Sequence, residues 1–494
     1  MYKVSISKNS STTYLDIPPF HPSNKYAEYK YKSISEITNP AYEEVRNSLF
    51  YLGYDKDNYG TEKWNPLSAI IQEGDHVVIK PNFVLSQHYE GGDLFSVITH
   101  PSVIRAVIDY VYLAINGNGK ITIADAPQMD CNFSELLEKT QLLSIQEFYK
   151  TTCQFTIDIL DLREFWLDKS LSKSTIASIK KRKELPGDPK GSTLINLGER
   201  SKFYKKMNMD MIYGADYNRD ETMKHHHGNI HEYSISNTIL DADVIMSIPK
   251  LKVHKKVGVT LNAKGLVGIN TNKNCLIHFT LGTPDNGGDQ FPDAVLSKRE
   301  KLLVDIQRYL FDTLLSKKIK IFDYIYQIIY KLYRYLIRPW FGTVKKEKVL
   351  LDAGNWQGND SAWRMTVDLV NIALFADKNG KIQQQPQRKL FSVIDGIIGG
   401  EKNGPLTPNI KQSGVIISGD NPISVDIVAA SLMGFNVQKI KSIYTPLSEM
   451  LNISLEDLEV LGVEEYRDVI NIPDRYLDFE PHPGWPDLLN EKSF

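Results

Sequence analysis

The segment GDHVVIKPN (residues 74–82) opens the pattern that decides the fold. Its β-branched run at 76–79 predicts a strand, the apolar residues spaced along 102–113 predict a helix, and ITIA at 121–124 predicts a second strand. Strand, helix and strand in this order form the βαβ unit of a parallel sheet. The core of the chain is therefore expected to be an α/β structure.

The same alternation continues outward from this unit. Further strands are expected at 155–160, 244–248, 390–394 and 414–418, and further helices at 362–375 and 422–433. The predicted fold class is α/β, with a mostly parallel sheet that carries helices on both faces and long insertions. The expected domain organisation is an N-terminal extension (1–73), a core (74–436) with insertions at about 165–240 and 271–350, and a C-terminal tail (437–494) packed on that core.

Composition narrows the function classes. The 494 residues are 42% hydrophobic and 24% charged with a net charge of −2, which suits a globular protein and argues against bulk nucleic-acid binding. The three cysteines form no C-x-x-C pair, so neither a disulfide framework nor an iron–sulfur cluster is expected. This usage fits a reducing cytoplasm, and residues 1–10 contain no apolar run of signal-peptide length.

Histidines are concentrated in one part of the chain. Six of the eleven fall between His225 and His278, four of them in KHHHGNIH (224–231). Neutral imidazole is the commonest metal ligand, so a divalent metal of unknown identity is a candidate cofactor. The candidate metal ligands are His225, His226, His227, His231 and His278. The alternative is a solvated loop with structural histidines, because no spacing here matches a known zinc pattern.

Lysines gather beside the histidines. The strand predicted at 244–248 runs into Pro249 and then delivers Lys250, Lys252, His254 and Lys255. A lysine cluster at a strand end suits an anion, and the imidazole of His254 suits general acid/base chemistry. The candidate residues for binding an anion are Lys80, Asn82, Lys250, Lys252, Lys255 and Asp289, and Lys264 is a candidate catalytic residue.

In an open α/β sheet, ligands bind beyond the carboxyl ends of the strands. Polar residues follow four predicted strands here, at Lys80–Asn82, at 125–127, at Lys250–His254 and at Asp395–Glu401. Asp395 and Glu401 are candidate acid/base groups or ligands for a hard cation. The alternative is that Asp395 starts a turn and Glu401 is a cap.

Residues 321–341 combine aliphatic, aromatic and basic side chains. Charged residues interrupt the segment too often for a membrane-spanning helix. Two interpretations stay open, a buried core helix with extended Lys and Arg side chains or an interfacial helix that contacts a membrane surface.

Four blocks together resemble the bacterial and archaeal family called domain of unknown function 362. They are GDHVVIKPN (74–82), ADVIMSIPKLKVH (242–254), GVTLNAKGLVG (258–268) and DGIIGGE (395–401), and the resemblance covers most of residues 74–436. Some members of this family carry a ferredoxin-type cluster module, for which this chain lacks the cysteines. Longer, histidine-rich members are associated with bacterial surface-polysaccharide gene clusters, which implies a similar context here.

The segment from Pro249 to Lys264 is also similar, more distantly, to nickel-pincer lactate racemases. In that family a histidine acts as acid/base, a lysine ten positions later holds the cofactor, and a downstream histidine ligates nickel. The resemblance implies these roles for His254, Lys264 and His278. The second acid/base histidine of those enzymes has no counterpart after Ala124–Pro127, so racemisation is not implied.

Two function classes follow from these residues. The first is a cytoplasmic enzyme that acts on a small anionic or phosphorylated substrate, in surface-polysaccharide metabolism, with a His/Lys-rich metal or anion site. The second is a non-catalytic accessory protein that binds a metal or a phosphorylated ligand, peripheral to the membrane through residues 321–341. Neither class expects a nucleic-acid partner.

Overall fold

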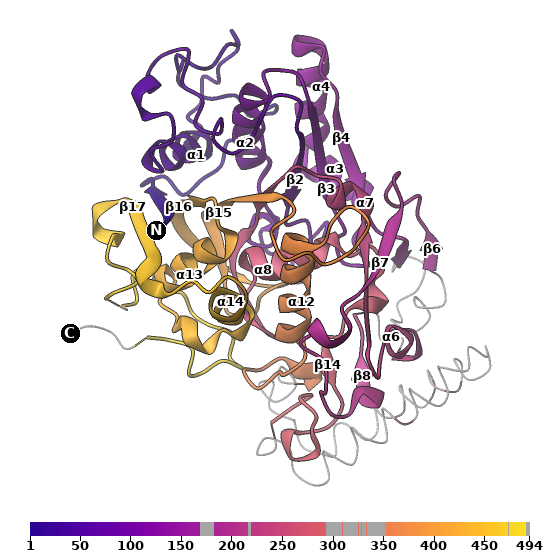
Figure 1. Cartoon of the computed structure of the whole chain (residues 1–494). Helices are drawn as coiled ribbons and strands as arrows, with labels where there is room; N and C mark the ends of the chain where they lie inside the picture. Colours follow the sequence, from indigo (N-terminus) through magenta and orange to yellow (C-terminus); the bar gives the residue numbers. More distant parts are fainter. Residues whose placement is uncertain are drawn as a thin grey trace.

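A ten-stranded sheet runs through the molecule in the order β17-β1-β16-β15-β11-β2-β3-β4, with β12 and β13 attached beside β15 (Figure 1). The computed structural model describes residues 1–167, 182–215, 219–292, 352–472 and 474–490, with Tyr309, Ile325, Ile328 and Leu332. The strands of this sheet are β1 (Tyr2–Lys8), β2 (His76–Pro81), β3 (Lys120–Asp125), β4 (Ile157–Asp161), β11 (Val244–Ile248), β12 (Lys250–His254), β13 (Gly258–Val259), β15 (Lys389–Glu401), β16 (Asn409–Gly419) and β17 (Leu458–Gly462).

The central part of the sheet is parallel. β15, β11, β2, β3 and β4 all pair in parallel, whereas β16 pairs antiparallel with both β15 and β1. The predicted α/β class with a mostly parallel sheet is thus confirmed. Each predicted strand is present, and β15 continues through Asp395 to Glu401, so that Asp395 lies within a strand rather than in a turn.

Helices cover both faces of the sheet, as predicted. Val77 and Ile79 of β2 pack into a core with α1 (Pro40–Tyr51) and α2 (Pro101–Ala114), whereas Val78 packs into the core on the other face. Successive side chains of a strand point to opposite faces, so this central strand is apolar on both. Figure 1 shows α1 and α2 on one side of the sheet and α8, α12 and α13 on the other.

Local sequence explains where the helices begin. Asn39 and Asn421 accept hydrogen bonds from the first turns of α1 and α13 (Pro422–Leu432), and a proline follows each of them at the first helical position. The remaining α-helices among the described residues are α3 (Phe133–Thr140), α4 (Leu142–Cys153), α6 (Arg219–His225), α7 (Asn237–Leu240), α8 (Leu261–Gly265), α12 (Ala362–Phe375) and α14 (Lys441–Thr445).

Small sheets of two or three strands are present in addition to the ten-stranded sheet. The described strands form the groups β7-β10-β9, β14-β8 and β5-β6. Their bounds are β5 (Phe165–Leu167), β6 (Arg182–Glu184), β7 (Ser192–Asn196), β8 (Ile212–Tyr213), β9 (His226–His227), β10 (Ile230–Ser236) and β14 (Phe279–Thr280). The histidine-rich run falls at α6, β9 and the start of β10.

Both ends of the chain contribute to the main sheet. β1 lies between β16 and β17, so the N-terminal segment and the C-terminal segment are joined to the core by strand pairing. The amphipathic segment 321–341 lies outside the described residues except for Ile325, Ile328 and Leu332, which are exposed. Among the described residues, no helix combines the length and apolar character needed to cross a membrane.

Candidate functional site

A pocket of about 390 Å³ opens at the carboxyl ends of β2, β3 and β12. Five lysines, two histidines and one carboxylate line it among the described residues. They are Lys80, Lys255, Lys256, Lys264, Lys273, His254, His278 and Asp125. Three of the four strand ends expected to form a cleft therefore do so, at the position where ligands bind in open α/β sheets.

The carboxylate of this pocket is already neutralised. Asp125 ends β3 and accepts from the amine of Lys80 at 2.8 Å and from the backbone N–H of Phe83 at 2.8 Å. Lys80 is 3% exposed, so this ion pair is shielded from water. Lys255, Lys264 and Lys273 form no salt bridge with any carboxylate that the structure describes, which leaves an excess of positive charge in the pocket. An anion is the complementary ligand.

The two imidazoles are held in opposite tautomers. Nδ1 of His254 accepts from the backbone N–H of Lys256 at 3.0 Å, so the neutral ring carries its proton on Nε2. Nδ1 of His278 lies 3.2 Å from the carbonyl oxygen of Leu276, so it must donate, and Nε2 keeps a lone pair. Neither Nε2 has a hydrogen-bond partner among the residues that the structure describes. The pocket thus offers one N–H donor and one basic nitrogen.

Burial keeps both rings neutral. Desolvation lowers the pKa of His254 and of His278 well below the usual value, and the positive charge of Lys264 lowers both further. Lys264 is the first charge that acts on each ring, which places it close to both. A neutral imidazole can donate a hydrogen bond through its N–H and accept a proton on its other nitrogen.

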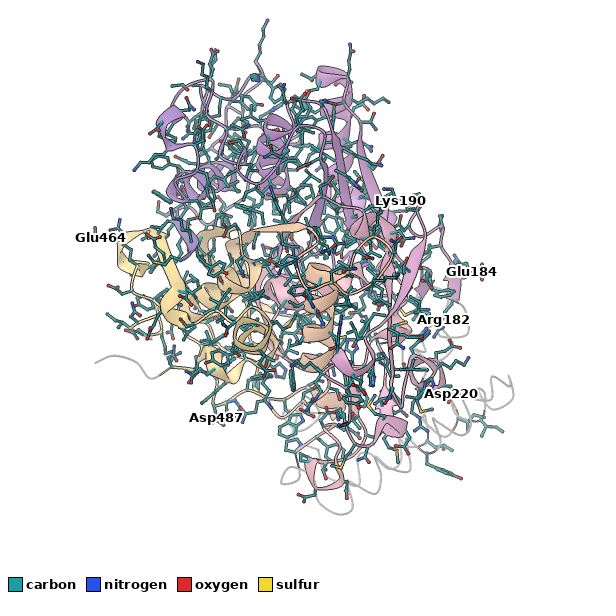
Figure 2. The ribbon with its side chains drawn as sticks, viewed as in Figure 1. Arg182, Glu184, Lys190, Asp220, Glu464 and Asp487 are labelled. Atoms are coloured by element: carbon teal, nitrogen blue, oxygen red, sulfur yellow. The ribbon has the colours of Figure 1, made fainter. Side chains whose placement is uncertain are left out.

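The pocket lysines are less exposed to water than the charged side chains on the surface of the protein. Lys190, Asp220 and Glu464 lie on the outside of the ribbon, in water (Figure 2). In contrast, Lys264 and Lys273 are 8% and 5% exposed, and burial lowers the pKa of Lys264 to about 8 and that of Lys273 to about 7. A bound anion would restore the charged form of both amines.

α8 positions Lys264. The carboxylate of Asp426, on α13, accepts at 2.8 Å from the backbone N–H groups of Asn262 and Ala263 at the start of α8. The carboxylate of Asp426 therefore occupies the N-terminus of α8, which is not open to a ligand anion. Asp426 instead anchors α8 to α13 and fixes the backbone that carries Lys264.

Several predicted site residues lie outside the pocket or are engaged elsewhere. Lys250 and Asp395 are fully buried and pair with each other at 2.9 Å, and Lys252 donates to the carbonyls of Val97 and Pro405. These three groups hold β12, β15 and the neighbouring loops together.

The remaining predicted polar residues also have structural partners. Glu401 accepts from the N–H of Glu480, and the buried carboxylate of Asp289 accepts from the N–H groups of Thr280 and Asp360. Asn82 lines the pocket, but its amide donates to the carbonyl of Val97. The structure thus brings together Lys80, Asn82, His254, Lys255, Lys264 and His278 of the predicted set.

The histidines of the 224–231 run do not share this pocket. His225 pairs with Glu232 at 3.1 Å, His226 contacts the carbonyl oxygen of Cys275 at 2.8 Å, and the exposed His227 contacts that of Met223. Neither ring nitrogen of the buried His231 has a hydrogen-bond partner among the described residues. Across the described ranges, no group of three or more His, Cys, Asp or Glu residues is arranged to hold a metal ion. The metal site stays a prediction.

Sequence reasoning missed Lys273. This lysine follows a short helical turn that ends at Ile269, in the run TNKNCL (271–276), where no periodic pattern marks a strand end. Its Nζ donates to the carbonyls of Val267 and Asn270, both at 3.1 Å, which holds the amine at the pocket wall. No signal in the sequence points to this residue.

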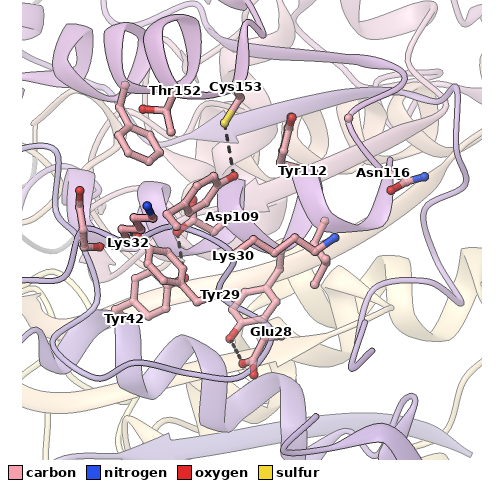
Figure 3. Close-up of a pocket in the computed structure, with 16 residues that line it drawn as sticks. Glu28, Tyr29, Lys30, Lys32, Tyr42, Asp109, Tyr112, Asn116, Thr152 and Cys153 are labelled. Atoms are coloured by element: carbon pink, nitrogen blue, oxygen red, sulfur yellow. Dashed lines mark hydrogen bonds between the residues drawn. The ribbon is translucent and has the colours of Figure 1, made fainter. Parts of the chain in front are cut away.

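A larger cavity of about 580 Å³ lies between the segment 28–33 and the C-terminal ends of α2 and α4 (Figure 3). Its two carboxylates are paired with arginines, Glu28 with Arg46 and Asp109 with Arg105. None of the predicted site residues lines it. Lys30 and Lys32 also line this cavity, but its described lining contains no histidine, so it lacks the two imidazoles of the pocket at the strand ends.

The sheet and its pocket define the class of the molecule, an α/β protein with a lysine-rich pocket at the strand ends. A family model described as Domain of unknown function (DUF362) matches residues 77–177 and 192–431. The chain belongs to this family, as the sequence blocks predicted. Searches of curated proteins and of solved structures returned no match. The more distant similarity to lactate racemases stays a prediction.

Proposed function

We propose that this protein is an enzyme that binds a small anionic substrate in the pocket at the strand ends and transfers a proton within it. The observation that carries the proposal is the lining of the pocket: five lysines face one carboxylate, and that carboxylate is paired with Lys80. A carboxylate or phosphate group would satisfy the positive charge of Lys255, Lys264 and Lys273, which form no salt bridge with the described residues.

The two histidines supply the acid/base chemistry in this proposal. Nε2 of His278 is suited to accept a proton, and Nε2–H of His254 is suited to donate a hydrogen bond to the oxygen that receives charge. Because both pKa values are lowered, the rings start neutral and need no prior deprotonation. In this proposal the substrate lies between a hydrogen-bond donor, Nε2–H of His254, and a proton acceptor, Nε2 of His278. This pairing favours an enzyme over a passive binding protein.

A divalent metal, if it takes part, would use His278 rather than His254. Metal-bound histidines usually donate the N–H of one ring nitrogen to a carbonyl and bind the metal through the other. His278 has this arrangement, whereas Nε2 of His254 carries the proton. Elemental analysis of the wild type and of His278→Ala tests this part, and a near-stoichiometric metal that is lost in the variant would support it.

Calorimetric titration with sulfate, phosphate, hydroxy acids and sugar phosphates tests the main proposal. Wild type and Lys264→Met are compared, with Lys402→Gln as control, since Lys402 pairs with Glu480 away from the pocket. Binding that weakens only in Lys264→Met, together with turnover of a bound compound that His278→Gln abolishes, is the expected result. Saturable binding without turnover would favour the accessory role, and no anion binding would overturn both.

The cellular setting is the remaining part of the proposal. The three cysteines Cys131, Cys153 and Cys275 are free thiols, which supports a reducing compartment such as the cytoplasm. The resemblance to histidine-rich members from polysaccharide gene clusters favours a phosphorylated sugar as substrate. Sugar phosphates are therefore the first compounds for the titration.

A further inference from the structure

Lys264 carries a buried amine that forms no hydrogen bond or ion pair with the described residues. Its side chain comes from α8 and is 8% exposed, and its Nζ makes no hydrogen bond or ion pair with any residue that the structure describes. Lys273 in the same pocket is equally buried, but its Nζ donates to two carbonyl oxygens. An amine that is withdrawn from water and left unpaired is costly to keep charged.

The neutral form of this amine is accessible near physiological pH. Burial lowers the pKa of Lys264 to about 8, and no carboxylate in the described part of the chain reverses the shift. A neutral amine has a lone pair and is a nucleophile toward carbonyl carbon. A lysine whose role was only to bind an anion as a permanent cation would be better served by a water-exposed or paired amine.

We propose that Lys264 forms a Schiff base with the carbonyl group of an anionic aldehyde or ketone bound in the pocket. This inference rests on the proposed function, because the positive wall formed by the other lysines is what holds the anionic end of the substrate. It deepens that function by naming the substrate class, an oxo acid or a phosphorylated carbonyl compound.

The chemistry balances with the groups present. Nζ of Lys264 attacks the carbonyl carbon, a C–N bond forms, and the carbonyl electron pair moves to oxygen, which accepts a hydrogen bond from Nε2–H of His254. Nε2 of His278 takes one proton from the nitrogen and passes it to this oxygen, which becomes the hydroxyl group of a carbinolamine. His278 then takes the second nitrogen proton and passes it to the hydroxyl group, which leaves as water as the C=N bond forms. Amine and carbonyl give imine and water, with no change in oxidation state.

Lys255 is the alternative nucleophile. Its Nζ also has no partner among the described residues, but it is only half-buried. The charge of Lys264 acts first on both His254 and His278, whereas the charge of Lys255 acts on His254 and on His482. Of these two amines, Lys264 alone is coupled to both imidazoles that the reaction uses. Lys256 also acts on both rings, but its Nζ donates to the carbonyl of Ala353.

Reductive trapping tests the proposal. The full chain is incubated with sodium cyanoborohydride and either pyruvate or dihydroxyacetone phosphate, and the adduct is located by peptide mapping. Acetone and dihydroxyacetone are the matched uncharged probes. A single adduct on Lys264, at least about tenfold weaker with the uncharged probes, is the expected result, and tenfold corresponds to one charge-assisted hydrogen bond. Lys264→Arg should abolish trapping, and Lys402→Arg, at a lysine that pairs with Glu480 away from the pocket, should retain it.

Other outcomes would overturn it. An adduct on Lys255, labelling spread over surface lysines, or equal labelling by charged and uncharged probes contradicts the proposal, and the wild-type map reports these without relying on any variant. Sulfate titration on the same preparation distinguishes failure of the Schiff-base proposal from failure of the proposed function. Sulfate binding without trapping rejects the Schiff base alone. Absence of both sulfate binding and trapping rejects the proposed function as well.

Discussion

The amine of Lys80 and the carboxylate of Asp125 meet at 2.8 Å across the ends of two neighbouring parallel strands, β2 and β3. Gly268 passes directly over this pair, since a Cβ placed on it would lie 1.8 Å from Oδ1 of Asp125 and 2.6 Å from Nζ of Lys80. The carbonyl of Gly268 also accepts from the N–H of Ala126 at 2.8 Å. The floor of the pocket therefore requires glycine at 268.

Gly268→Ala is expected to separate Lys80 from Asp125. Overpacking of this kind costs about 1–3 kcal/mol in the free energy of unfolding, and it should also weaken sulfate binding. Gly265→Ala is the matched control, because a Cβ there meets no atom closer than 4.0 Å. Urea unfolding and calorimetric titration measure both variants. Equal behaviour of the two would contradict the tight fit at Gly268.

Sulfate affinity should fall as the pH rises through about 7 to 8. The pKa of Lys273 is about 7 and that of Lys264 about 8, so binding at higher pH must first protonate these amines. The dissociation constant is expected to rise up to about tenfold per pH unit for each amine above its pKa. Sulfate itself does not titrate in this window. Lys264→Met should lose the step near pH 8, and a constant affinity across the range would refute the role of these amines.

Stability should depend on the neutral form of His231. Its ring is fully buried and makes no hydrogen bond with any residue that the structure describes, and burial lowers its pKa from 6.5 to about 4. The unfolded chain therefore takes up a proton first, so this contribution to stability is complete above pH 6.5 and is lost as the pH falls toward 4. His231→Leu should lessen the loss of stability between pH 7.5 and 5.5 by about 1.4 kcal/mol.

The control for this prediction is His227→Gln, at an exposed position of the same run. His231→Leu also removes two unsatisfied nitrogens, so we expect it to raise the free energy of unfolding at pH 7.5 by about 1 kcal/mol. Urea unfolding at the two pH values measures both effects. An unchanged pH dependence would show that His231 has a partner in solution.

Asp395 is expected to matter for stability rather than for catalysis. Asp395→Asn leaves the fully buried amine of Lys250 without its counter-charge, which costs about 3–5 kcal/mol in the free energy of unfolding. Glu401→Gln should cost less than about 1 kcal/mol, because Glu401 pairs with the partly exposed Lys411 at 3.4 Å. Sulfate affinity of the folded protein should be unchanged in both. A stable Asp395→Asn protein that binds substrate but does not turn it over would restore the acid/base role.

The fold was more predictable than the site. Strands such as His76–Pro81 and Val244–Ile248 are visible as apolar runs because burial on both faces of a parallel sheet leaves no room for polar residues. The site was predictable where it follows a strand end, as at Lys80 and His254. It was not predictable at Lys273, which reaches the pocket only through the path of an irregular loop.

The sequence by itself determined the order of strands and helices and the stretch from His254 to Lys264, because both are local patterns of apolar spacing and residue type. Only the tertiary structure decided which of the many lysines are available. Lys250 forms an ion pair with Asp395, 145 positions away, whereas Lys264 forms no ion pair with any carboxylate that the structure describes. Charge, pKa and reactivity depend on burial and on partners from distant segments, and these are set when the sheet assembles.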